Sequence, residues 1–175
     1  VYKRQFFLSG LSKSVAAGLR AGWVACPPGF ANRLPVAHKL LTGGMPFLLA
    51  EKGARIVLSG EADEIATRVR SETQHRIAMT GTTFSGIESN FHPHCPFIWL
   101  KLPEPWRTGT FVSAARDMGI LVDGDDEFQF SQDDASMHRV RIAISTPPNR
   151  DILRNGLSKL RILLDAGPSG YDSYA

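Results

Sequence analysis

Residues 8–23 read LSGLSKSVAAGLRAGW, and this stretch holds the features that decide the fold. It carries Lys13 and Arg20, seven positions apart, among serines and glycines. The short apolar run 6–9 leads into it, and a second run, 22–26, overlaps its end before two prolines. Short apolar runs bounded by turn residues are typical of buried strands. We therefore expect a tight connection between two strands, with the lysine and the arginine on it.

The side chains on this connection suit an anion site beside a reactive amine. A lysine forms a Schiff base only in its neutral form, which burial or a neighbouring cation favours. Ser12, Gly18 and Gly22 supply a hydroxyl and points where the backbone can approach a ligand closely. Arg20 suits bidentate phosphate recognition better than a lysine would. The residues alone predict a lysine beside an anion site, with ordinary solvated charges as the alternative.

Composition limits the class of protein. The 175 residues are 43% hydrophobic and 21% charged, with a net charge of +3, which fits one domain or two small ones. The basic residues are spread along the chain, so no nucleic-acid surface is predicted. The cysteines, Cys26 and Cys95, predict free thiols rather than a disulfide framework. With no signal peptide and no apolar run near the ~20 residues that cross a bilayer, we expect a cytoplasmic protein without membrane contact.

The two ends of the chain are not expected to belong to the fold. Residues 1–5 read VYKRQ, without an initiator Met, and match the translated end of a transposon adapter used in shotgun sequencing. We expect them to be such a scar, in which case the chain is a fragment cut upstream of Phe6. The tail, residues 168–175, is expected to fray.

Helices are predicted in the middle of the chain. Residues 32–49 read as helical pieces broken around Gly43, Gly44 and Pro46. A long helix is predicted from about Glu61 to about Met79, because acidic residues crowd its first turn and residues of one stripe recur every four positions. The stripe consists of Ile65, Val69, Thr73 and Ile77.

The second half predicts a small α/β domain. The expected elements are a strand in PFIWLKLP (96–103), a helix capped by Thr108 and stopping at Gly119, a strand at 120–123, a strand at 139–145, and a helix capped by Asn149. Along 139–145 the residues alternate, with Val140, Ile142 and Ile144 facing one way and Arg139, Arg141 and Ser145 the other. The last helix has an apolar stripe of Leu153, Leu157, Leu160 and Leu164.

The segment SKSVAAGLRAGW (12–23) closely resembles the Schiff-base lysine segment of class I/II aminotransferases, the fold-type I enzymes that use pyridoxal 5′-phosphate (PLP). The family pattern reads Ser-Lys, then Gly-x-Arg-x-Gly at a fixed spacing, and this chain fits it. The resemblance implies that Lys13 is catalytic, forming the Schiff base with PLP and moving the substrate's α-proton. It implies that Arg20 and Ser12 hold the cofactor phosphate. The family usually has Ser or Thr where Gly10 stands, so Ser9 beside it is the remaining candidate.

Two downstream segments extend the resemblance to nearly the whole chain. FIWLKLP resembles the family's small-domain strand FLWLxLP, although His94-Cys95 replaces the usual Gly-Gly before it. VRIAIS resembles the family's IRLxxS strand, which implies that Arg141 binds the substrate carboxylate. Arg139 shares its face and is the competing candidate, and either arginine could simply be solvated.

The resemblance implies an α/β fold, the C-terminal part of a fold-type I PLP-dependent transferase. Residues 6–75 would be the end of the large, mostly parallel sheet domain, and residues 76–167 the small domain. The full-length protein would be a homodimer that acts on an amino acid or amine.

Two functions stay open within this family. Residues 91–128 look most like the aminotransferase-like half of MocR-type regulators of the GntR class. The first function is therefore an aminotransferase that moves an amino group from an amino acid. The alternative is a transcriptional regulator that senses PLP and an effector without turnover and meets DNA only through a missing N-terminal domain.

Three weaker patterns are better explained by structure than by chemistry. His92, His94 and Cys95 lack a spaced fourth ligand, so we predict a polar loop rather than a metal site. The acidic run 123–127 lacks the spacing of a calcium loop, so we expect a solvated turn. Phe97 and Trp99 are expected to belong to the core.

Overall fold

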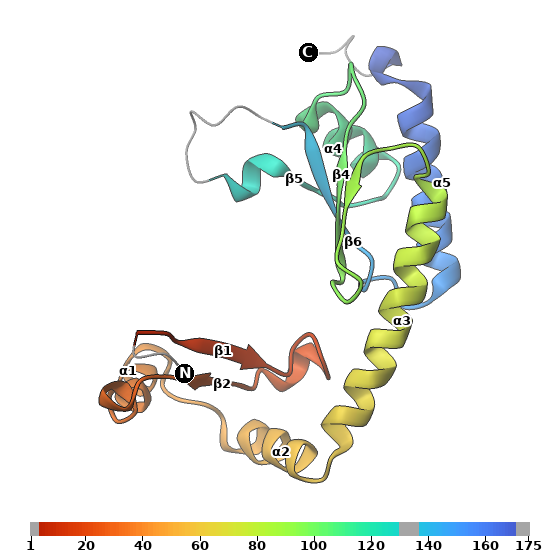
Figure 1. Ribbon diagram of the computed structural model, residues 1–175. Helices are drawn as coiled ribbons and strands as arrows, with labels where there is room; N and C mark the ends of the chain where they lie inside the picture. Colours follow the sequence, from red (N-terminus) through yellow and green to blue (C-terminus); the bar gives the residue numbers. More distant parts are fainter. Residues whose placement is uncertain (1–3, 130–136, 171–175) are drawn as a thin grey trace. The chain divides into compact units, whose positions relative to one another are not determined.

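The computed structural model describes residues 4–129 and 137–170 (Figure 1). The chain forms two compact units, one ending at Ser71 and the other beginning at Glu72. Residues 1–3 of the expected adapter scar and residues 171–175 of the expected tail lie outside the described residues.

The first unit contains the two predicted strands. β1 spans Phe7–Gly10 and β2 spans Gly22–Ala25, and they pair antiparallel with Gly10 opposite Gly22. Both strands lie where the apolar runs predicted them, but the expected burial is wrong: Phe7 and Leu8 are 60% and 72% exposed, and Trp23 and Val24 are 48% and 43% exposed. Every strand pair among the described residues is antiparallel, so the parallel strands expected of a large domain are not among them.

Two helices follow: the first lies within the predicted range 32–49, and the second starts inside it and continues to Leu58. α1 spans Arg33–Thr42 and ends at Gly43, whose φ of 75° is a conformation that glycine adopts at little cost. α2 spans Phe47–Leu58 and starts directly after Pro46. The predicted break between the two helices is therefore confirmed.

The long helix α3 spans Glu61–Thr83, which is four residues longer than predicted. Threonines near its end favour strands, but here their hydroxyls donate to backbone carbonyls one turn earlier, as Thr80 does to Arg76 at 2.8 Å. Phe84, 3% exposed, follows the last turn. Burial of this ring and of Thr80 explains why the helix continues past Met79.

The second unit is built on a four-stranded antiparallel sheet in the order β3-β4-β6-β5. The strands are β3 (Ser89–Asn90), β4 (Phe97–Lys101), β5 (Asp123–Gly124) and β6 (Arg139–Ala143). The strand predicted at 120–123 is wrong for most of its length. Ile120 instead donates its N–H to the carbonyl of Ala115, closing the preceding helix, and only Asp123 enters the sheet.

The remaining helices are α4 (Thr108–Asp117) and α5 (Arg150–Ala166). Asn149 caps α5 as predicted, since its side chain accepts from the N–H of Ile152 at 2.9 Å. The predicted cap at Thr108 is wrong, because Thr108 lies inside the first turn of α4 and its hydroxyl donates to Asp125 at 2.9 Å. The short 3-10 helices are η1 (Ala17–Leu19), η2 (Pro28–Phe30), η3 (Asp125–Phe128) and η4 (Pro168–Gly170).

The core of the second unit lies on one face of its sheet. Ile98 and Leu100 of β4 and Val140 and Ile142 of β6 are at most 5% exposed. They pack with apolar residues of α4, α5 and the end of α3 in a single cluster. The predicted leucine stripe of α5 is buried in this cluster, which confirms it. The opposite face of the sheet carries the residues that alternate with these, Arg141 among them.

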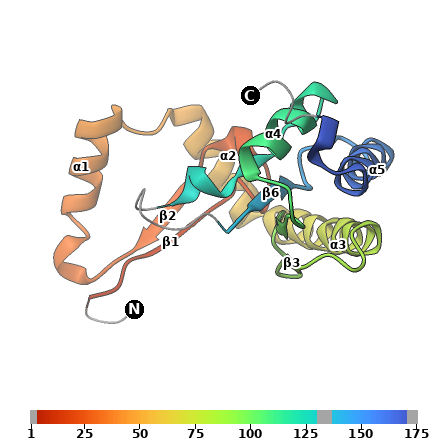
Figure 2. The ribbon, with the colours of Figure 1, turned by 90° about the horizontal axis from the view of Figure 1, so that it is seen from above.

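A charged cluster joins α3 to α5 within this unit, where the two helices lie side by side in both views (Figures 1 and 2). Arg76, 8% exposed, binds Glu72 at 2.7 Å and donates Nη1 to the carbonyls of Ile144 and Pro147. Arg150 also binds Glu72, with its Nε 3.0 Å from Oε2. These hydrogen bonds, first from Arg150 and then from Arg76, lower the pKa of Glu72 to about 2.

Two sequence expectations concern the chain as a whole. Cys26 and Cys95 are free, half-buried thiols, as predicted. Within residues 4–129 and 137–170, none of the helices has both the length and the hydrophobicity that a bilayer-spanning segment needs.

Candidate cofactor and carboxylate sites

The connection between β1 and β2 has a defined shape. The N–H of Leu11 donates to the carbonyl of Ala21 at 2.9 Å, and the N–H groups of Val15 and Ala16 both donate to the carbonyl of Leu11. Leu11 and Leu19 are 3% and 7% exposed. Two buried leucines and these backbone bonds therefore fold the loop back on itself and leave its polar side chains outside the core.

The four residues predicted to hold PLP all lie at this end of the hairpin. Ser9 and Ser12 are half-buried, while Lys13 and Arg20 are exposed. Arg20 has a positive φ of 49°. Among the described residues other than glycine, His138 is the other one with a positive φ. A residue with a side chain pays a free-energy cost to adopt this left-handed backbone conformation, and glycine does not. Backbone strain thus coincides with a residue predicted to bind phosphate.

Gly10 is explained by its partner across the hairpin. A Cβ at Gly10 would lie 3.0 Å from the carbonyl oxygen of Ala21, and one at Gly22 would lie 2.9 Å from that of Ser9. The contact at Gly22 is shorter than Cβ atoms in proteins show, and the one at Gly10 is tighter than most of them, so both glycines let the strands approach closely. The serine or threonine that the family usually has at this position would therefore crowd the carbonyl of Ala21 in this chain.

An apolar cavity of about 420 Å³ lies against the same hairpin. Its walls come from the hairpin, from Met45 and from α2, and none of the four predicted PLP ligands lines it. The residues that line the cavity are apolar and do not suit a phosphate. We therefore do not assign this cavity to the cofactor.

Arg141 of β6 occupies a second candidate site, in the second unit. Its Nε and Nη2 both donate to Oδ2 of Asp123, at 2.9 and 2.6 Å. Its guanidinium carbon lies 4.5 Å from the ring centre of Phe97 and 4.4 Å from that of Phe128. Cation–π contacts at these distances hold the guanidinium in place together with the ion pair. No sequence pattern indicates this pair, because strand register, not spacing, brings position 123 opposite position 141.

Arg139, the competing candidate, has a different environment. Its Nη2 binds Glu88 at 2.7 Å, and Lys101 binds the same carboxylate at 2.9 Å. These contacts, led by the hydrogen bond from Lys101, lower the pKa of Glu88. The Nε of Arg139 is buried and has no hydrogen-bond partner in the described structure.

A pocket of about 480 Å³ surrounds Arg141 but does not include Arg139. Its walls are largely aromatic: Asn90, Phe91, His92, Cys95, Phe97, Trp99 and Phe128. The expectation that Phe97 and Trp99 belong to the core is wrong, since both are half-buried and line this pocket. The apolar run FIWL contains no alternation that would show which residues face the helices.

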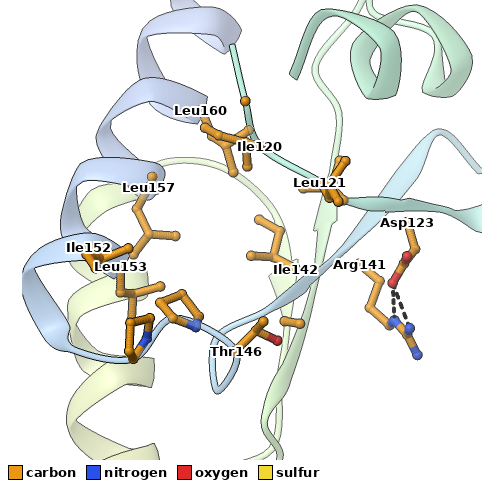
Figure 3. A pocket seen from close by; sticks show the side chains of 16 residues that line it. Ile120, Leu121, Asp123, Arg141, Ile142, Thr146, Ile152, Leu153, Leu157 and Leu160 are labelled. Atoms are coloured by element: carbon orange, nitrogen blue, oxygen red, sulfur yellow. Dashed lines mark hydrogen bonds and ion pairs between the residues drawn. The ribbon is translucent and has the colours of Figure 1, made fainter. Parts of the chain in front are cut away.

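Another cavity of the second unit lies on the opposite side of β6 from the aromatic pocket and has a volume of about 490 Å³ (Figure 3). Its main walls are leucines and isoleucines of α5, β6 and the segment before β5. The Arg141–Asp123 pair stands at its rim, and the side chain of Arg141 extends away from Ile142 and the α5 leucines (Figure 3). The guanidinium therefore belongs to the aromatic pocket.

The acidic run 123–127 is a structural element more than a solvated turn. Asp125, 8% exposed, accepts from the hydroxyl of Thr108 at 2.9 Å and from the N–H of Arg139 at 3.3 Å. Asp123 pairs with Arg141, so the expected solvated turn is wrong for both residues. No group of three possible metal ligands occurs in the described parts of the chain, including the loop with His92 and His94.

Comparison with known sequences finds a transcriptional regulator as a relative. No protein-family model matches the chain. The uncharacterized HTH-type transcriptional regulator YdeF of Bacillus subtilis is 29% identical over 163 residues. The match covers 90% of this chain and 34% of that regulator, so the chain spans about a third of its relative's length.

Comparison with solved structures identifies the fold. The kynurenine aminotransferase of Pyrococcus horikoshii is 19% identical, with a TM-score of 0.81 over 94% of this chain and 41% of that chain. The multiple substrate aminotransferase of Thermococcus profundus is 20% identical, with a TM-score of 0.78 over 95% of this chain and 42% of that chain. The chain has the α/β fold of the C-terminal part of fold-type I PLP-dependent aminotransferases.

Proposed function

We propose that the chain is the C-terminal part of a PLP-binding aminotransferase-like domain, in a protein that transfers an amino group from an amino acid. The β1–β2 hairpin carries this proposal. It presents Lys13, Arg20 and Ser12 on the loop and Ser9 on the adjoining end of β1, in a chain with the fold of PLP-dependent aminotransferases. The domain boundary, near residue 75 in the sequence, belongs to the same proposal.

The donors on this loop and on the end of β1 fit the chemistry of PLP. A guanidinium and two hydroxyls are suitable partners for a phosphate, and an exposed lysine amine beside them can reach an aldehyde. Gly10 and Gly22 keep the hairpin narrow where it enters the loop. The residues present therefore match the group that the fold implies.

Each residue has a role in this proposal. Lys13 would hold the cofactor covalently through Nζ, and the same amine would accept and return the proton of the substrate's α-carbon. Arg20, Ser12 and Ser9 would bind the phosphate and fix its orientation. Arg141 would bind the substrate carboxylate. When bound, PLP supplies the electron sink that stabilises negative charge at the α-carbon.

The similarity to YdeF supports a second candidate function, that of a regulator. In this case the same residues would bind PLP and an amino-acid or amine effector without turnover. Contact with DNA would belong to a domain outside this chain. The two functions share the binding step and differ in whether transfer of the amino group comes after it.

The binding step is tested by the visible absorbance of PLP added to the full-length protein. We expect a band from the covalent complex in the wild type, its loss in Lys13→Ala, and its retention in Lys39→Ala. Lys39, an exposed lysine of α1, is the matched control. An unchanged band in Lys13→Ala would refute the assignment.

The two functions are separated by a second pair of measurements on the same protein. An aminotransferase converts amino acids from a panel to oxo acids with loss of the covalent band. A regulator leaves the panel unchanged and shows a shift in DNA binding that depends on PLP. Turnover without any PLP effect on DNA would exclude the regulator.

A further inference from the structure

The guanidinium of Arg141 has one of its two hydrogen-bonding edges already occupied. A guanidinium can bind a carboxylate along the Nε–Nη2 edge or along the Nη1–Nη2 edge. Asp123 takes the first edge, because its Oδ2 accepts from both Nε and Nη2. Among the described residues, Nη1 donates to no partner. In Figure 3 the third nitrogen of Arg141 lies on the side away from Asp123.

The open edge belongs to a guanidinium whose position is well defined. Phe97 and Phe128 contact it, and Trp99 packs edge-on against Phe128 with ring centres 5.3 Å apart. The side chain of Arg141 is 27% exposed, so it is reachable from the aromatic pocket. Arg139 and Lys101, the other cations on this face, both pair with Glu88. The pocket therefore offers one open cationic edge beside apolar walls.

We propose that Asp123 is a positioning residue that fixes Arg141 so that its Nη1–Nη2 edge receives the carboxylate of a ligand with an apolar body. This inference rests on the proposed role of Arg141 as the carboxylate receptor. Asp123 binds the Nε–Nη2 edge of the guanidinium, and the rings of Phe97 and Phe128 restrict the orientation of its plane. The ligand carboxylate binds the Nη1–Nη2 edge. The ligand class is a molecule with a single carboxylate, since Arg141 is the one arginine or lysine among the described residues that line this pocket.

The opposite possibility is that Asp123 competes with the ligand for Arg141. Its negative charge opposes an incoming anion, whereas its oxygen orients the guanidinium. Asp123→Asn keeps an acceptor oxygen in nearly the same place and removes the charge. Asp123→Ala removes both. The two variants therefore separate orientation from charge.

The test is calorimetric titration of the full-length protein, with PLP added, by 3-phenylpropanoate. This unreactive probe has one carboxylate and one ring, and its uncharged amide is the ligand control. We expect Asp123→Asn to bind the probe as tightly as the wild type or a few-fold tighter, because only the repelling charge is lost. We expect Asp123→Ala to bind it about tenfold more weakly, because Arg141 is no longer oriented. Asp126→Ala, an exposed acid in the same run, should match the wild type.

Every other pattern overturns the inference. Tighter binding in both variants would show that Asp123 competes with the ligand, and equal binding in both would show that it has no part in recognition. No binding of the probe by the wild type would show that the pocket is not a carboxylate receptor. Asp123→Glu guards against an unfolded alanine variant. Asp123→Glu keeps the negative charge and moves the carboxylate oxygen. If Asp123 orients Arg141, this variant binds the probe more weakly; if Asp123 competes with the ligand, it binds the probe without loss of affinity.

The outcome is separable from that of the proposed function. A covalent PLP band without affinity for the probe would overturn the role of Asp123 and leave the cofactor assignment standing. The predicted order of the Asp123 variants without any PLP band would overturn the cofactor assignment alone.

Discussion

Replacing Glu72 by Gln is expected to destabilise the second unit at neutral pH and to have little effect in acid. Glu72 accepts hydrogen bonds from Arg150 and Arg76, which hold its pKa at about 2 instead of the ordinary 4.5. A carboxyl group whose pKa is lower in the folded state stabilises that state at pH values above about 4.5, and this contribution is lost as the pH falls toward about 2. The difference between wild type and Glu72→Gln should therefore vanish over this window.

The magnitude follows from the same lowering of the pKa. At about 1.4 kcal/mol for each tenfold change in an equilibrium constant, the change from 4.5 to about 2 has an upper bound of about 3 kcal/mol. The side chain of Glu72 is 38% exposed, so solvent screens the ion pair and the expected loss is about 1 kcal/mol.

The assay is urea unfolding of both proteins across this pH range. Glu64→Gln is the matched control, because Glu64 lies on the same helix and its contact with Arg68 is a 3.9 Å pair of exposed side chains. We expect a loss of about 0.5 kcal/mol or less for this control, because its charge favours the first turn of α3 but its side chain is exposed. An equal loss of stability at every pH in Glu72→Gln, or none at neutral pH, would show that the two arginines do not stabilise the fold through the charge of Glu72.

Two further substitutions test the cofactor hairpin. Arg20→Gly should raise the free energy of unfolding by about 1 kcal/mol, because glycine adopts the left-handed conformation without strain. The same substitution should weaken PLP binding at least about tenfold, because the phosphate loses its guanidinium partner. Urea unfolding and a PLP titration check the two effects, and unchanged PLP affinity would contradict the phosphate role. Gly22→Ala should lower the free energy of unfolding by about 1–3 kcal/mol, because the new Cβ meets the carbonyl of Ser9. Gly18→Ala is the control, since a Cβ at Gly18 meets nothing within 4 Å. Equal losses of stability in both variants would contradict the close approach of the two strands.

The sequence predicted most of the elements where a local pattern determines them. The alternation in 139–145 identified the buried face of β6, and the leucine stripe with the Asn149 cap identified α5. Glycine and proline marked the break between α1 and α2. Each of these signals depends on residues that are neighbours in the chain.

The sequence could not predict the interactions that depend on pairing across the fold. The ion pair of Asp123 with Arg141 joins residues 18 positions apart through strand register. Thr108 has the side chain of a helix cap, but its hydroxyl donates to Asp125, whose place no spacing reveals. Likewise, the reason for Gly10 became visible only when its partner strand was placed opposite it.

The proposed function depends above all on Lys13 as the residue that binds PLP covalently. Reduction of the PLP-loaded full-length protein with borohydride, followed by peptide mapping, locates the modified lysine directly. We predict the phosphopyridoxyl group on the peptide that contains Lys13. Its presence on Lys39 or Lys52 instead, or on no lysine at all, would contradict the proposal.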